Sequence, residues 1–145
     1  KRQNIDTCGA VFTREEPFFS KLEELMKYTD MLMLDIKHID DEQHKILTGH
    51  SNKNILAMAR ELSDMKKPVW IRHALVPGGS DKDEYLHRLA DFIHTLSNVE
   101  RVEVLPYHTL GKFKWENLGL SYPLEGVNPP TQERIDNARK ILGAI

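Results

Sequence analysis

The run Met31–Lys37 constrains the fold of this chain more than any other stretch. Its sequence is MLMLDIK, so four consecutive apolar residues lead into an acid and a base. A strand that is apolar on both faces is typical of a parallel sheet covered by helices. Side chains alternate along a strand, so we expect Asp35 and Lys37 to point the same way. Parallel α/β folds bind ligands at the carboxyl ends of their strands, so we expect the functional site here.

The rest of the 145 residues predicts one domain, spanning 1–145. Apolar spacing and turn signals predict strands over 3–7, 31–37, 68–76 and 101–107. They predict helices over 16–28, 40–49, 54–66, 80–96 and 131–145, with a short helix or lid-like loop over 111–118. This alternation predicts a parallel α/β sheet with right-handed crossovers. Helices should cover one face, as in a barrel, or both, as in a doubly wound sheet.

Composition excludes several classes of function. The net charge is −2 and no Lys/Arg-rich run is present, which disfavours a nucleic-acid partner. No apolar run reaches membrane-spanning length and no signal peptide opens the chain, so we expect a cytoplasmic protein without a membrane partner. Cys8 is the only cysteine, so the chain builds no internal disulfide and no thiolate cage for zinc or an iron–sulfur cluster. The chain opens without methionine and enters a strand at once, so we expect it to be part of a longer protein.

All four expected strands end in polar residues. These are Asp6 and Thr7, Asp35 and Lys37, Arg72 and His73, and Tyr107 and His108. In a parallel sheet these ends share one edge, where their charges suit a zwitterionic ligand with a carboxylate, an amine and hydroxyls, or a bound cation. Taken singly, Asp6 or His108 is typical of a solvated strand end, and His73 alternates away from Arg72 toward helices or solvent. Spacing alone therefore names no reaction.

Several segments resemble one family, the radical S-adenosylmethionine (SAM) activases of glycyl radical enzymes. The clearest are DTCG at 6–9, MLMLDIK at 31–37 and LPYHTLGKFKW at 105–115. The resemblance continues through WIR at 70–72, LVPG at 75–78 and GVNPP at 126–130, so it covers nearly the whole chain. The pattern LPYHxLGxxKW is specific to this group, whereas DxK and IRxxxVPG are weaker alone.

The resemblance implies a partial (β/α) barrel of six strands, of which this chain supplies the last four parallel strands. The first two strands are then missing, and with them the CxxxCxxC loop that holds a [4Fe–4S] cluster, so we expect the chain alone to be inactive. In the full-length parent, a radical SAM oxidoreductase, a 5′-deoxyadenosyl radical removes a hydrogen atom from a backbone glycine of the partner. The LPYH block favours pyruvate formate-lyase over diol dehydratases as that glycyl radical enzyme, with a flavodoxin-type reductant.

The resemblance also implies roles for individual residues. Residues that correspond to SAM contacts are Asp35, Ile36, Lys37, Arg72 and His108. Residues that correspond to a monovalent cation site beside the cofactor carboxylate are Asp6, Thr7, Asp35 and, through its carbonyl, Met33. A cation there would offset the repulsion between carboxylates. The cofactor carries the chemistry, so the resemblance implies no catalytic residue and no iron–sulfur ligand in this chain.

Two other functions stay open. One is a fragment of a different α/β-barrel enzyme, of the aldolase or sugar-phosphate isomerase type, with Lys37 as the reactive amine, although Asp35 beside it disfavours a low-pKa amine. The other is an interaction module. The first strand would expose unpaired backbone groups, so we expect self-association through residues 3–7 or through an apolar barrel interior.

Overall fold

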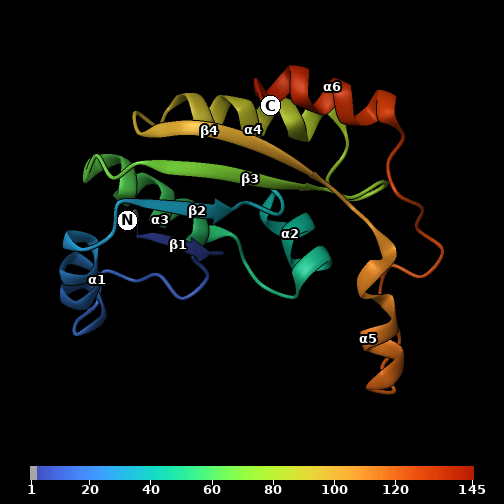
Figure 1. Ribbon diagram of the computed structural model, residues 1–145, viewed down its shortest axis with the longest axis horizontal. Helices are drawn as coiled ribbons and strands as arrows, with labels where there is room; N and C mark the ends of the chain where they lie inside the picture. The colour runs from blue at the N-terminus through green and yellow to red at the C-terminus, as the bar shows by residue number, and fades with distance from the viewer. Residues whose placement is uncertain (1–2) are drawn as a thin grey trace.

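The computed structural model describes residues 3–145 and has one sheet of parallel strands (Figure 1). The strands are β1 (Asn4–Thr7), β2 (Met31–Asp35), β3 (Val69–Leu75) and β4 (Val99–Pro106). Their order in the sheet, β1-β2-β3-β4, is their order in the chain. Every strand pair is parallel, so each connection crosses over the sheet. This arrangement confirms the predicted α/β fold and fits four consecutive strands of a partial barrel.

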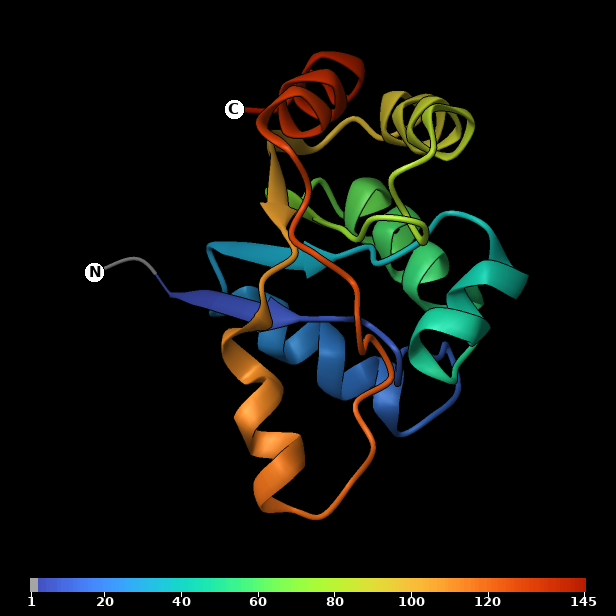
Figure 2. The same ribbon diagram turned by 90° about the vertical axis from the view of Figure 1, so that its right-hand side faces the viewer.

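The helices show which of the two predicted arrangements the chain adopts. They are α1 (Phe18–Lys27), α2 (Asp41–Thr48), α3 (Lys53–Asp64), α4 (Asp83–His94), α5 (Lys112–Asn117) and α6 (Gln132–Leu142), with a 3-10 turn, η1 (Thr109–Gly111). In the turned view, α1, α3 and α4 surround one face of the curved sheet (Figure 2). Helices on one face are the arrangement of a barrel wall, so the doubly wound alternative is not adopted. We call the opposite side of the sheet the open face.

A single hydrophobic core lies between the sheet and the helices. The alternation of side chains decides which strand residues enter it: Leu32 and Leu34 of β2 are buried, whereas Met33 and Asp35 turn to the open face. The strand side of the core includes Leu32, Leu34, Val69, Ile71, Leu75, Val102 and Val104, and the helix side includes Leu22, Ile55, Leu62, Leu86, Leu89 and Ala138. The open face therefore carries the polar side chain of Asp35 beside that of Met33.

Two helices begin at a residue whose side chain caps the first turn. Asp40 accepts a hydrogen bond from the backbone N–H of Gln43 at 3.1 Å, and α2 ends at Gly49 with a φ of 80°. Thr131 accepts a hydrogen bond from the N–H of Arg134 at 3.3 Å and begins α6. Capping chemistry visible in the sequence therefore fixes where these helices start.

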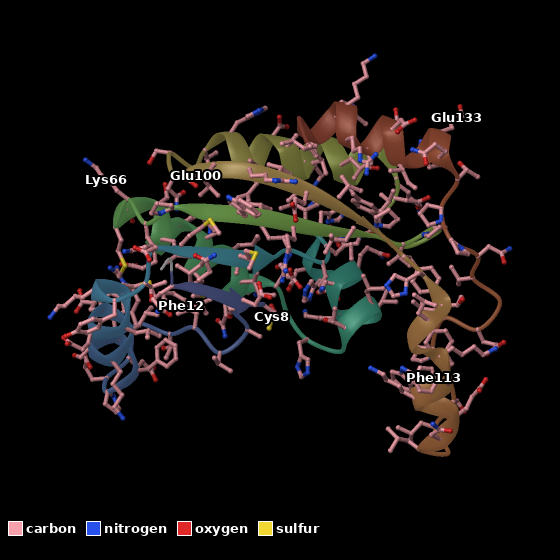
Figure 3. All side chains as sticks on the ribbon, viewed as in Figure 1. Cys8, Phe12, Lys66, Glu100, Phe113 and Glu133 are labelled. Carbon is pink, nitrogen blue, oxygen red and sulfur yellow. The ribbon has the colours of Figure 1, made fainter. Side chains whose placement is uncertain are left out.

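Some element boundaries differ from the prediction. Strand β2 ends at Asp35, so Lys37 lies in the following loop, and β4 begins at Val99 because a register shift opposite Val69 and Trp70 lengthens it. The segment expected as a short helix or loop forms η1 and α5, which project away from the sheet; Phe113 marks this helix in Figure 3. Across the described residues 3–145, none of the helices is both long and apolar enough to span a membrane.

Gly9 forms the turn after β1 and allows a close approach to the core. Its φ is +67°, and a Cβ at this position would lie 3.0 Å from Sδ of Met58 and 3.2 Å from Cδ1 of Leu34. We expect Gly9→Ala to lower the free energy of unfolding by about 2–4 kcal/mol, because left-handed strain and steric overlap add. Urea denaturation measures this loss.

Gly78 provides the matched control for that substitution. Its φ is +73°, but a Cβ there would meet nothing within 4 Å. Gly78→Ala should therefore cost only the backbone strain, about 1–2 kcal/mol. Equal losses for the two variants would contradict the contact with Met58 and Leu34.

Candidate cofactor site

Neighbouring strands bring three of the sequence-predicted residues to one place on the open face. Asp35, the last residue of β2, is the register partner of Arg72 in β3, and Asp6 of β1 is the partner of Met33. Register partners in a parallel sheet project on the same side. Asp6, Asp35 and Arg72 therefore project together near the carboxyl ends of the strands, and Lys37 joins them from the loop after β2.

These residues form a linked group of ion pairs, which we call the charged cluster: Asp6, Asp35, Lys37 and Arg72. Arg72 Nε lies 2.7 Å from Asp35 Oδ1, and Arg72 NH1 lies 3.2 Å from Asp6 Oδ1. Lys37 Nζ lies 2.7 Å from Asp35 Oδ2. Asp35 is thus the centre of the cluster, since each of its carboxylate oxygens accepts a hydrogen bond from a different cation.

Exposure within the charged cluster is graded. The side chains of Asp35 and Arg72 are 17% and 20% exposed, that of Lys37 is 34% exposed, and that of Asp6 is 60% exposed. Partial burial opposes the charge of Arg72, but its hydrogen bond to Asp35 and the charges of Asp35 and Asp6 outweigh this effect and raise the pKa of Arg72. The cluster therefore presents two cations and two carboxylates together, with Asp35 and Arg72 partly buried and Asp6 open to solvent.

The other residues predicted to contact a cofactor take different positions. The side chain of Ile36 is buried, 1% exposed, and its backbone N–H donates to the carbonyl of Arg72 at 2.9 Å. His108 follows β4 at the same end of the sheet and its imidazole is exposed. Within residues 3–145, His108 makes none of the contacts that link the charged cluster. The structure therefore gathers the predicted charges but leaves His108 separate from them.

The proposed cation ligands meet a competing positive charge. Asp6 and Asp35 both contact Arg72, while Thr7 Oγ1 accepts a hydrogen bond from the N–H of Gly9 at 3.0 Å. Among the described residues no group of three or more His, Cys, Asp and Glu side chains is placed to hold a metal ion. Arg72 and Lys37 thus supply the positive charges that balance the two carboxylates in this structure.

Sequence reasoning missed a second polar group on the open face. The guanidinium carbon of Arg101 lies 4.8 Å from the ring centroid of Trp70, and Arg101 NH2 lies 2.9 Å from Glu103 Oε1. The signal was present in β4, where Arg101 and Glu103 alternate with buried Val102 and Val104. The expectation of an apolar barrel interior was therefore wrong, because charged residues extend along the open face.

Comparison with known proteins assigns this arrangement to a family. Residues 2–92 match the family described as "Radical SAM superfamily", a stretch that contains β1, β2, β3 and the whole charged cluster. The chain belongs to the radical SAM superfamily. Membership implies SAM as the cofactor and a [4Fe–4S] cluster in full-length radical SAM proteins.

Curated relatives of this radical SAM chain are substantially longer than it is. It is 57% identical over 138 residues to the pyruvate formate-lyase-activating enzyme of Streptococcus mutans, covering 95% of this chain and 52% of that protein. It is 51% identical over 146 residues to the enzyme of that name from Staphylococcus epidermidis, covering 98% of this chain and 58% of that protein. The chain therefore spans about half the length of the curated relatives it matches.

A solved structure supports the radical SAM fold. A domain of pyruvate-formate lyase-activating enzyme from Bacteroides vulgatus superposes with a TM-score of 0.76 at 22% identity, covering 98% of this chain and 75% of that domain. At this identity the likeness concerns the fold alone.

The described residues fit one of the two groups that radical SAM membership implies. SAM carries a carboxylate and an amine, and the charged cluster offers two cations and two carboxylates within reach of one another. An iron–sulfur cluster needs several thiolates, whereas Cys8 is the only cysteine of the chain. Cys8 is a free thiol and is exposed beyond β1 (Figure 3).

Proposed function

We propose that this chain is the cofactor- and substrate-binding part of a radical SAM activating enzyme that generates a glycyl radical on pyruvate formate-lyase. One observation carries the proposal: the charged cluster lies at the carboxyl ends of β1–β3 in a chain that is 57% identical to such an activating enzyme. When bound in the full-length enzyme, the cofactor supplies the 5′-deoxyadenosyl radical that removes a hydrogen atom from the target glycine.

The charged cluster and its neighbours would bind and orient SAM. Lys37 and Arg72 are cations suited to the carboxylate of the cofactor, and Asp35 is suited to its amine. His108, exposed after β4, would meet the adenosyl end, and Ile36 would contribute through its backbone. None of these residues transfers a proton in the proposed reaction, so their role is to hold the ligand and to shield it from water.

A monovalent cation belongs to the proposal as a second ligand. It would bind Asp6, Thr7, Asp35 and the carbonyl of Met33. Because Asp6 and Asp35 both contact Arg72, a bound cation would compete with Arg72 for their oxygens. Arg72 would then be released toward the carboxylate of SAM.

The remaining parts of the activity would come from outside the chain. We propose that the [4Fe–4S] cluster belongs to the other half of the longer enzyme, that a flavodoxin-type protein reduces it in the cytoplasm, and that the isolated chain does not cleave SAM.

Self-association through the edge of β1 also stays a prediction. The aldolase-type alternative is disfavoured because Lys37 Nζ is held in an ion pair with Asp35 at 2.7 Å and is not a free amine in a dry, apolar pocket.

A hybrid enzyme tests the proposal. In this hybrid, residues 1–145 replace the matching segment of the Streptococcus mutans activating enzyme, which supplies the rest of the protein. After anaerobic iron–sulfide reconstitution, we expect SAM cleavage and an electron paramagnetic resonance signal of a glycyl radical on pyruvate formate-lyase. The isolated chain, treated identically, should give neither.

Two outcomes of this experiment would contradict different parts of the proposal. A hybrid that takes up its cluster but does not bind SAM would disprove the cofactor site. A hybrid that cleaves SAM yet leaves pyruvate formate-lyase without a radical, while the parent enzyme succeeds, would disprove the assigned partner.

A further inference from the structure

His73 is a buried histidine directly beneath the charged cluster. It follows Arg72 in β3, so its side chain projects into the core, and it is 2% exposed. Its Nδ1 lies 2.8 Å from the carbonyl oxygen of Ile36, the residue between Asp35 and Lys37. The predicted orientation toward the helices is therefore confirmed, yet the imidazole still contacts the backbone of the site.

Two consecutive residues of β3 hold the segment 35–37 from both faces of the sheet. On the open face, Arg72 binds the carboxylate of Asp35, and its carbonyl accepts the N–H of Ile36. On the core face, His73 contacts the carbonyl of the same residue, Ile36. Both backbone groups of Ile36 are thus bonded to β3, although β2 ends at Asp35.

The surroundings of His73 determine where its proton lies. Nε2 faces the carbonyl of Ser80 at 3.4 Å, so both ring nitrogens face carbonyl acceptors. Burial lowers the pKa of His73, which favours the neutral ring with a single N–H. The contact of Nδ1 with Ile36 is the shorter of the two, and a hydrogen bond weakens as its length increases.

We propose that His73 is a positioning residue whose Nδ1–H donates to the carbonyl of Ile36 and thereby fixes Asp35 and Lys37 on the open face. The contact is made inside the protein and requires no ligand. Its consequence for SAM rests on the proposed function, because only a ligand bound at the charged cluster would depend on how Asp35 and Lys37 are held.

Nuclear magnetic resonance on the unmodified chain gives the first test. The ¹⁵N shifts of an imidazole distinguish the Nδ1–H tautomer from the Nε2–H tautomer. We expect His73 to carry its proton on Nδ1, with a cross-peak linking this proton to the carbonyl carbon of Ile36. Finding the proton on Nε2 would overturn the proposal without any substitution.

Two substitutions separate the hydrogen bond from packing. The amide nitrogen of asparagine occupies the place of Nδ1, so His73→Asn retains a donor to Ile36, whereas His73→Leu fills the space without one. In His73→Leu we expect the carbonyl carbon of Ile36 to shift and the order parameter of the Lys37 amide to fall below about 0.85, the value of rigid backbone. His73→Asn should restore both.

Affinity for SAM in the hybrid enzyme gives the functional readout. His73→Leu should weaken binding about 3- to 10-fold, and His73→Asn should stay within about twofold of the unmodified hybrid. Equal behaviour of the two variants in the carbonyl shift and in affinity would overturn the proposal. If the unmodified hybrid does not bind SAM, the proposed function fails, while the ring shifts and the Ile36 carbonyl still decide the role of His73.

Discussion

Replacing Asp35 with asparagine is expected to weaken SAM binding by the hybrid enzyme at least about tenfold, measured by isothermal titration. Each carboxylate oxygen of Asp35 accepts a hydrogen bond at 2.7 Å, one from Arg72 and one from Lys37. An asparagine side chain offers one oxygen and places an N–H group against the other cation. One of the two cations would therefore lose its acceptor and leave its present position, and the site would lose its central negative charge.

Asp91→Asn is the matched control. Asp91 is exposed on α4, and its substitution removes the same charge at a site away from the charged cluster. It should leave the affinity for SAM within about twofold. Arg72→Gln gives a further check: because Arg72 and Asp35 act as a pair, its effect should be smaller when Asp35→Asn is already present than when made alone. Unchanged affinity in a folded Asp35→Asn hybrid would remove the charged cluster from the site.

Truncation of Ile71 is expected to have the largest effect on stability. Ile71 lies in β3 between β2 and β4, and its side chain is 0% exposed in the core. Ile71→Ala should lower the free energy of unfolding by about 2–5 kcal/mol, since it loses buried apolar surface and leaves a cavity. This is a large fraction of the total of about 5–15 kcal/mol for a domain, and it corresponds to a fall in Tm of roughly 6–15 °C in thermal unfolding.

Ile46→Ala removes the same atoms from the surface and serves as the comparison. Ile46 lies on α2 with a side chain that is 77% exposed. Its truncation should change the free energy of unfolding by no more than about 0.5 kcal/mol. Similar losses for Ile71 and Ile46 would mean that β3 is not packed as the structure places it.

The fold was predictable because its determinants are local in the sequence. The apolar run before Asp35, the cap at Asp40 and the glycine at Gly49 each act over a few residues, and parallel topology follows from their order. Boundaries were less predictable. Strand β4 gains residues from Val99 because of its pairing with β3, and no local pattern records that partner.

The charged cluster was predictable as a set of residues but not as a geometry. Parallel strands bring Asp6, Asp35 and Arg72 to one end of the sheet, which follows from topology alone. That Arg72 bridges the two carboxylates depends on side-chain reach across three strands. The contact from His73 to Ile36 was hidden for another reason, because a side chain that bonds to a backbone carbonyl leaves no signature in the partner's residue type.

The adjacency of Arg72 and His73 limits how this strand can change in evolution. Inserting or deleting one residue of β3 before Arg72 would shift the register of the strand by one. Arg72 would then face the core, and His73 would face the open side of the sheet. A guanidinium would then enter the core without a carboxylate beside it, at a cost of several kcal/mol, and the imidazole would emerge into water. Length variation among homologous chains should therefore collect in the crossovers, while β3 keeps its number of residues even where its apolar side chains are exchanged.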